Sequence, residues 1–326
     1  MKKHLFLSII CILSSFVVKA YDFKTDGIYY MIVNMSESTV CVTDGENSYS
    51  GNIIIPETVN YQNRTFRVVG IADEAFKNSK ITSISLPNSM HLICSEAFYG
   101  CGNLKSIDLP DSLVYIGAAA FKQCGLESLV LPDNVRVVDA AAFADCSSLK
   151  TVVLGPLVGG GFATRIYIPE FGKECYKKLL SAVFVNCKNV EKLIIKDSTS
   201  QLETDIDVQA DSHRIGGGVP FIYHFVNLKT LYVGRYLEGP DGRANLYHLT
   251  NLEHLELSKY ARIEPINSDL KTLKVHRKMP KKVDGTDYFT TKTKMNAILY
   301  VPKGSAKYYK EADMWKDFWN IVEMDD

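Results

Sequence analysis

Hydrophobic positions recur along this chain with a period of 22 or 23 residues. Each unit opens with Ala-Phe and then places its aliphatic residues in the order aliphatic, two others, aliphatic, one other, aliphatic. Four consecutive units match at these positions, and their phenylalanines are Phe76, Phe98, Phe121 and Phe143. A fixed period of this length is typical of a solenoid, in which each unit stacks on the next.

The spacing inside a unit predicts a short strand that buries alternate residues. One such strand cannot cover its own apolar face, so we expect the units to stack about 4.8 Å apart into a parallel sheet. The pattern continues less regularly to residue 302. The first aliphatic residues of its strands are Ile81, Leu104, Leu126, Leu149, Val190, Leu228, Leu252 and Leu270. Two long intervals in this series predict insertions at 156–183 and 196–224.

Both ends of such a stack need caps, because the terminal strands have open edges. Strand-like runs in residues 21–70 predict an N-terminal β cap, residues 71–303 the repeat solenoid, and residues 304–326 a helical C-terminal cap. The aromatic side chains expected to close the C-terminal end are Tyr308, Trp315, Phe318 and Trp319. The predicted fold class is therefore a mainly β repeat solenoid, a right-handed superhelix with a parallel sheet.

The first 20 residues have the pattern of a secretory signal peptide. Lys2 and Lys3 precede an apolar run at 5–18, and small residues before Tyr21 predict cleavage after Ala20. The run is short for a membrane span, and no later segment is apolar for long enough to form a transmembrane helix. We therefore expect an exported protein, either secreted or displayed on the cell surface.

Charge and composition exclude several partners. The formal net charge of the whole chain is zero, and loss of the three signal-peptide lysines leaves about −3. There is no basic excess for a nucleic-acid backbone and no polybasic patch for a membrane surface. The composition agrees with a folded monomer and does not indicate a ligand.

Cysteine is the repeated residue that could carry chemistry. Seven cysteines remain after signal cleavage, an odd number, so at least one thiol stays unpaired. Cys101, Cys124, Cys146 and Cys187 share one position of the repeat. Stacking makes their side chains point the same way, which suits neither a disulfide nor a tetrahedral zinc site. We interpret them as buried reduced thiols that act as small apolar fillers.

Other candidate sites are weak. Histidines such as His248 and His254 form no ligand motif, and the glycine runs at 159–161 and 216–218 lack the Lys and Ser/Thr of a phosphate loop. Asp205, Asp207 and Asp211 lack calcium-loop spacing and are interpreted as a solvated acidic loop. The sequence thus predicts no catalytic residue, metal site or cofactor.

A charged column is predicted at the position after each first aliphatic residue. It reads Thr82, Lys105, Glu127, Lys150, Glu191, Lys229, Glu253 and Lys271, so the sign alternates from Lys105 onwards. In a stack these side chains are neighbours, and alternation removes repulsion between like charges. The column is a structural device, and it supports the strands near 191, 229 and 253 as members of the same stack.

A second outward column is the candidate binding site. It reads Ser85, Asp108, Val130, Val153, Ile194, Tyr232, Glu256 and Lys274, and it is apolar only in its middle. One interpretation is that the two insertions fold over this apolar stretch, since large exposed apolar patches are uncommon. The other is that Val130, Val153, Ile194 and Tyr232 form a ligand-binding stripe, since the sheet face of a solenoid is a usual binding surface.

The repeats AFYGCGNLKSIDLPDSLVYIG and AFKQCGLESLVLPDNVRVV resemble those of BspA-like leucine-rich repeat proteins, as do the entry segment at 21–76 and the C-terminal segment LYVPKGSAKYYKEADMWKDFWNIVE. The insertions depart from that pattern. The resemblance implies an exported protein of gut or oral anaerobes without catalytic residues, and some members of the family are adhesins for host extracellular-matrix proteins.

The sequence therefore favours a non-catalytic binding protein that contacts host or envelope macromolecules, protein or glycan, through the sheet face and the insertions. A carbohydrate-active enzyme on a parallel β scaffold and a structural envelope spacer are the alternatives. The sequence does not name the ligand or say whether the protein stays anchored.

Overall fold

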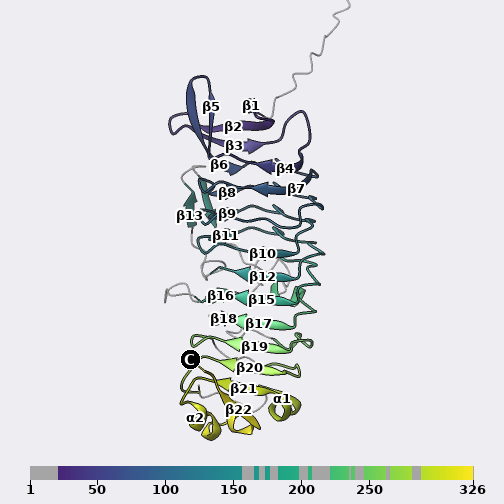
Figure 1. The fold of residues 1–326 in the computed structure, drawn as a ribbon, viewed down its shortest axis with the longest axis vertical. Coiled ribbons are helices and arrows are strands. Elements are labelled where there is room, and N and C mark those ends of the chain that lie inside the picture. The colour runs from purple at the N-terminus through teal and green to yellow at the C-terminus, as the bar shows by residue number, and fades with distance from the viewer. Residues whose placement is uncertain are drawn as a thin grey trace, which may run out of the picture.

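The protein is an elongated stack of short strands (Figure 1). The computed structural model describes residues 21–155, 165–168, 173–176, 183–197, 205–207, 221–234, 236–238, 246–261, 265–280 and 288–325. Strands dominate and helices are few and short. The prediction of a mainly β repeat solenoid with parallel sheets is confirmed. The proposed signal peptide lies outside the described residues.

One sheet begins antiparallel at the N-terminal end and becomes parallel along the stack. Three antiparallel strands open it: β1 (Phe23–Thr25), β2 (Ile28–Asn34) and β3 (Thr39–Thr43). Parallel strands follow in the order β6 (Arg64–Ile71), β8 (Leu92–Ile93), β9 (Tyr115–Ile116) and β11 (Val137–Val138). A further strand, β5 (Thr58–Tyr61), pairs antiparallel with β6. Each repeat contributes two aliphatic segments, and the short strands β8, β9 and β11 are the second of these along the chain.

The first aliphatic segments of the repeats form the other face of the solenoid. Parallel strands β4 (Ser50–Ile54) and β7 (Lys80–Ser85) pair with each other. Farther along lies an eight-stranded parallel sheet: β10 (Ser128–Val130), β12 (Thr151–Leu154), β15 (Lys192–Ile195), β17 (Thr230–Val233), β19 (His254–Leu257), β20 (Thr272–Val275), β21 (Ile298–Val301) and β22 (Asn320–Glu323). The strands predicted near 191, 229 and 253 are therefore members of one sheet.

Four strands lie in or beside the predicted insertions. β13 (Arg165–Ile168) pairs antiparallel with β14 (Lys173–Tyr176), and β16 (Asp205–Asp207) pairs in parallel with β18 (Tyr236–Glu238). The interpretation of Asp205 and Asp207 as part of a loop is wrong, because both lie in a strand. Asp211 is outside the described residues. The pairing partner of β16 is about 30 residues away along the chain, so no local pattern indicated it.

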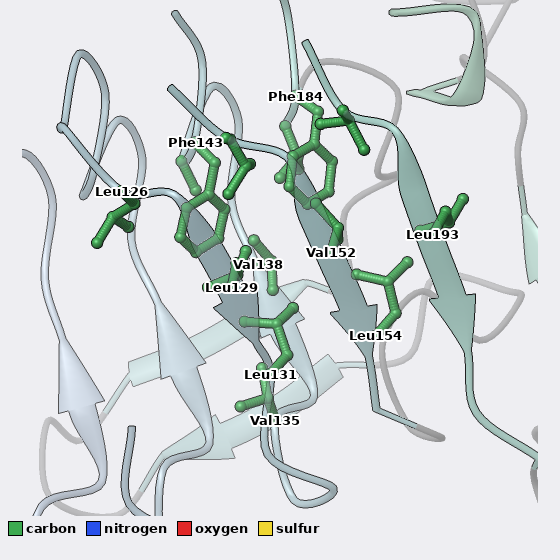
Figure 2. Close-up of a cluster of buried hydrophobic side chains, with 14 of the residues drawn as sticks. Leu126, Leu129, Leu131, Val135, Val138, Phe143, Val152, Leu154, Phe184 and Leu193 are labelled. Atoms are coloured by element: carbon green, nitrogen blue, oxygen red, sulfur yellow. The ribbon is translucent and has the colours of Figure 1, made fainter. Parts of the chain in front are cut away.

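Stacked phenylalanines form the core of the repeats. Phe76, Phe98, Phe121, Phe143 and Phe184 stack face to face, with ring centroids 5.1, 4.9, 5.2 and 5.6 Å apart. Figure 2 shows Phe143 and Phe184 at the same position of neighbouring units, above Val152 and Leu193 of neighbouring strands. All of these side chains are buried. The repeated aliphatic and aromatic residues therefore form one continuous hydrophobic core.

Short helical turns lie at the C-terminal end and before one strand. They are η3 (Phe221–His224), α1 (Thr291–Asn296), α2 (Ala306–Glu311) and η4 (Trp315–Asp317). Trp315 and Phe318 are buried as expected, but Tyr308 is 37% and Trp319 70% exposed. The expectation that all four aromatic residues close this end is wrong for Tyr308 and Trp319. None of the described helices is both long and apolar enough to span a membrane.

The corners of the repeats use left-handed backbone on both sides of each phenylalanine. The residues two before and two after Phe76, Phe98, Phe121 and Phe143 have positive φ: Glu74, Asn78, Glu96, Gly100, Ala119, Gln123, Ala141 and Asp145. Alanine in this conformation brings its Cβ too close to the following carbonyl oxygen. The corners at Ala119 and Ala141 therefore store backbone strain.

Replacing Ala119 by glycine is expected to stabilise the protein by about 0.5–1 kcal/mol, because relief of the strain at φ 53° outweighs the entropy that glycine adds to the unfolded chain. Urea denaturation followed by circular dichroism measures this. The neighbouring Ala120→Gly is the control and should destabilise, since Ala120 is fully buried and lacks a positive φ. A loss of stability in Ala119→Gly equal to that of the control would contradict the strain.

Candidate functional site

The structure brings the four predicted site residues together in one column. Val130 pairs with Val153, Val153 with Ile194, and Ile194 with Tyr232 across β10, β12, β15 and β17. Their neighbours along each strand, such as Leu129 and Leu131, point into the core and are buried, so the column faces outward.

Exposure varies along this column. Val130 is 53% exposed, whereas Val153, Ile194 and Tyr232 are half-buried. The register continues to Glu256 and Lys274 and then to Tyr300 and Val322, so the apolar stretch is followed by two charged positions and then by two uncharged ones. The insertions proposed to cover the column lie mostly outside the described residues, and both interpretations of the column stay predictions.

Tyr232 is the polar anchor of the apolar stretch. Its hydroxyl donates a hydrogen bond of 2.7 Å to Oδ1 of Asp197, just beyond the end of β15. Burial, together with this hydrogen bond, raises the pKa of Tyr232 above its usual range. The side chain is therefore a neutral, oriented ring that presents an apolar surface rather than an acid–base group.

The charged part of the column is internally paired. Nε2 of His276 lies 2.7 Å and Nζ of Lys274 3.2 Å from Oε1 of Glu256. Burial alone would raise the pKa of Glu256, but hydrogen bonds from His276 and Lys274 outweigh it and lower the pKa of that carboxyl. This arrangement stabilises the fold above the ordinary carboxyl pKa, and the contribution is lost as acidification protonates Glu256.

The alternating charges form the predicted ladder. Backbone N–H groups link each rung to the one before it in the series Lys105, Glu127, Lys150, Glu191, Lys229, Glu253 and Lys271. Two of the side-chain pairs are ion pairs, with Nζ of Lys229 3.4 Å from Glu191 and Nζ of Lys271 2.8 Å from Glu253. These pairs are exposed to solvent, so each contributes little to stability. The charged column is structural, as predicted.

The cysteine column is also structural, with one addition to the prediction. Cys101, Cys124, Cys146 and Cys187 are buried and unpaired. Each thiol donates a hydrogen bond of 2.9–3.1 Å to the carbonyl oxygen of the phenylalanine in the unit before it, at Phe76, Phe98, Phe121 and Phe143. The thiols are therefore weak donors as well as small fillers. The side chain of Cys175 is not among those described.

We expect Cys146 and Cys187 to resist alkylation in the native protein at neutral pH, because burial raises the pKa of both thiols to about 12. Iodoacetamide labelling followed by peptide mass mapping tests this, with the urea-unfolded protein as the fully labelled control. Rapid native labelling of either thiol would contradict their burial.

A groove on the same face was not predicted. It has a volume of about 540 Å³ and is lined by Ser106, Ile107, Asp108 and Leu109 together with Ser128 and Val130 of β10. It lies where the parallel sheet is interrupted: residues 104–109 occupy the rung between β7 and β10 but form no strand. In the described chain, the N–H groups of residues 105–109 donate no backbone hydrogen bond to β7 or β10.

The interruption exposes part of the core. Ile107 and Leu109 are half-buried, whereas Leu129 and Leu131 at the same positions of the next unit are 2% and 0% exposed. The unpaired segment at residues 104–109 is the broken rung. Its unit has two residues between Cys101 and Leu104, whereas the next unit has only one between Cys124 and Leu126. It also places Asp108, a residue disfavoured in strands, at the outward position. The difference in spacing and the aspartate at position 108 were the two features of the sequence that could have indicated this interruption.

The described residues hold no group of three or more His, Cys, Asp or Glu side chains that could bind a metal ion. The glycine runs at 159–161 and 216–218 lie outside the described chain. Within it, the column of Val130, Val153, Ile194 and Tyr232 and the groove beside it lie on the same face of the sheet.

A comparison with family models agrees with the repeat pattern. A family model for the BspA type leucine rich repeat region matches six copies over residues 69–158. A comparison with curated proteins finds no match. The solved structures that are similar to the chain include three leucine-rich repeat proteins. A leucine-rich repeat protein from Bacteroides ovatus is 18% identical with a TM-score of 0.36, and the match covers 94% of this chain and 100% of that one. A leucine rich repeat protein from T. pallidum is 19% identical with a TM-score of 0.41, and covers 78% and 85%. A leucine rich cell surface protein from Faecalibacterium prausnitzii is 16% identical with a TM-score of 0.32, and covers 93% and 95%. Residues 69–158 of this chain are therefore a leucine-rich repeat region of the BspA type.

Proposed function

We propose that this protein is an exported, non-catalytic binding protein that holds a host or envelope macromolecule on the outer face of its eight-stranded sheet. One observation carries the proposal: Val130, Val153, Ile194 and Tyr232 lie in one register column that faces away from the core. The proposal includes export through the signal peptide at 1–20 and the division into a 21–70 cap, a 71–303 solenoid and a 304–326 cap.

The geometry of the column supports binding over catalysis. Apolar side chains on neighbouring strands lie about 4.8 Å apart and form a flat stripe, which suits an extended ligand. Tyr232 adds an aromatic ring held in place by Asp197. Covering such side chains releases about 25 cal/mol for each Å² of apolar surface. The charges that follow the stripe at its C-terminal end, Glu256 and Lys274, are paired with each other.

An array of glycans and matrix proteins, probed with the protein lacking residues 1–20, tests the proposal. Saturable binding without turnover supports it. Release of a cleaved product would favour a carbohydrate-active enzyme, and the absence of any saturable ligand would favour a structural spacer.

Substitutions in the stripe then locate the binding site. Ile194→Asp and Tyr232→Asp are expected to abolish binding of the array ligand, whereas Thr82→Asp, an exposed residue of β7 outside the stripe, should leave it unchanged. Unchanged binding in both stripe variants would overturn the assignment. Thermal denaturation of the same variants tests the covering interpretation, since a carboxylate buried under an insertion lowers stability by several kcal/mol.

A further inference from the structure

The groove beside β10 has properties that the rest of the sheet face lacks. In an unbroken parallel sheet, backbone N–H and C=O groups bond to the strands on both sides. Among the described residues, the N–H groups of residues 105–109 donate to neither neighbouring strand. The one carbonyl of residues 104–109 that accepts from the next unit there is that of Lys105, which accepts from the N–H of Glu127. The unused backbone groups of this rung are therefore available to a ligand.

The groove also has an apolar floor. Ile107 and Leu109 are half-buried, whereas Leu129 and Leu131 at the same positions of the next unit are buried, and Val130 is 53% exposed. A ligand that covers these three side chains removes apolar surface from water, which is the main favourable term in most associations. No aromatic ring of the described residues lines the groove, so these residues offer no stacking platform for a sugar ring.

The charged side chains that line the groove indicate which charge its ligand carries. Asp108, Asp111 and Asp133 line it together with Lys196. Nζ of Lys196 lies 2.6 Å from Oδ1 of Asp133, so these two charges are paired. Asp108 and Asp111 have no ion pair in the described chain and leave the groove with a net negative charge.

We propose that the groove binds an extended peptide segment that carries lysine or arginine side chains. The main chain of the peptide bonds to the free backbone groups of the broken rung, its aliphatic side chains cover Ile107, Leu109 and Val130, and its cations pair with Asp108 and Asp111. This inference rests on the proposed binding function and names a ligand class for one end of the same face.

Two capped heptapeptides test the charge preference, one alternating Val and Lys and one alternating Val and Glu. Isothermal titration calorimetry at low ionic strength should show saturable binding of the Val-Lys peptide and none of the Val-Glu peptide. Raising the salt concentration should weaken binding because the charges are exposed. Equal binding of both peptides, or no binding of the Val-Lys peptide, would overturn the proposal.

An isosteric variant tests the site. The double substitution Asp108→Asn and Asp111→Asn is expected to weaken Val-Lys binding about tenfold or more. The control Glu311→Gln, an exposed carboxylate of α2 at the other end of the stack, should have no effect. Unchanged affinity in the double variant would mean that the peptide binds elsewhere and would overturn the assignment to the groove. Binding of a neutral glycan that depends on Asp108 and Asp111 would also overturn it.

The failure of this inference can be told apart from failure of the proposed function. If the Val-Lys peptide does not bind but an array ligand depends on Ile194 and Tyr232, the sheet face binds ligands and the groove assignment alone is wrong. If the array finds no saturable ligand but the Val-Lys peptide binds in an Asp108- and Asp111-dependent way, the groove assignment stands and the stripe is wrong.

Discussion

Replacement of Phe121 by alanine is expected to lower the free energy of unfolding by about 3–5 kcal/mol. The side chain is fully buried in the middle of the phenylalanine stack, with the rings of Phe98 and Phe143 4.9 and 5.2 Å away on its two faces. Truncation leaves a cavity and removes two stacked pairs at once. Because each unit contacts only its neighbours, the variant should also broaden the unfolding transition, as the two halves of the stack become less coupled.

Urea denaturation followed by circular dichroism measures both effects. The control Phe121→Leu keeps most of the apolar volume and loses only the stacking, so its destabilisation should be clearly smaller. A loss below about 1 kcal/mol in Phe121→Ala would contradict a continuous phenylalanine core.

Replacement of Gly125 by alanine is expected to destabilise the protein by about 3 kcal/mol. A Cβ at this position would lie well inside van der Waals contact of the Gly102 carbonyl group in the preceding unit. The unit at Gly125 is one residue shorter than the unit before it between the cysteine and the first leucine, and the two backbones approach closely there. The backbone at Gly102 cannot move aside as a flexible side chain can. The added Cβ at position 125 would therefore force the two units apart.

Gly102→Ala is the matched control, because a Cβ there meets no atom within 4 Å. Its stability should change by no more than about 0.5 kcal/mol. Thermal denaturation of the two variants side by side measures the difference. Equal stabilities would contradict the close approach of the two units.

The sequence was sufficient to predict the stack because its signals repeat. The same phenylalanine recurs once in each unit, at Phe76, Phe98, Phe121 and Phe143. Four units therefore support the interpretation of the chain as a stack of repeats. The same register aligned Val130 with Tyr232 across two insertions, and the alternating charges supported that alignment.

The features that the sequence did not predict depend on non-local pairing. Ile107 and Leu109 are aliphatic like their buried counterparts Leu129 and Leu131, and the failure of residues 104–109 to pair with β7 and β10 leaves them more exposed. The pairing of β16 with β18 joins segments that share no repeat position. The exposed ring of Trp319 likewise depends on how the last turns pack, which composition does not specify.

Amide hydrogen exchange tests the central claim most directly, namely that the outward face of the sheet binds a ligand, at one end in the groove that forms where the sheet opens at residues 104–109. In the free protein, the amides of residues 106–109 should exchange far faster than those of residues 151–153, which are paired in β12 on both sides. Addition of the Val-Lys peptide should slow exchange at 106–109 and leave 151–153 unchanged. Equal protection of the two segments in the free protein would contradict the account.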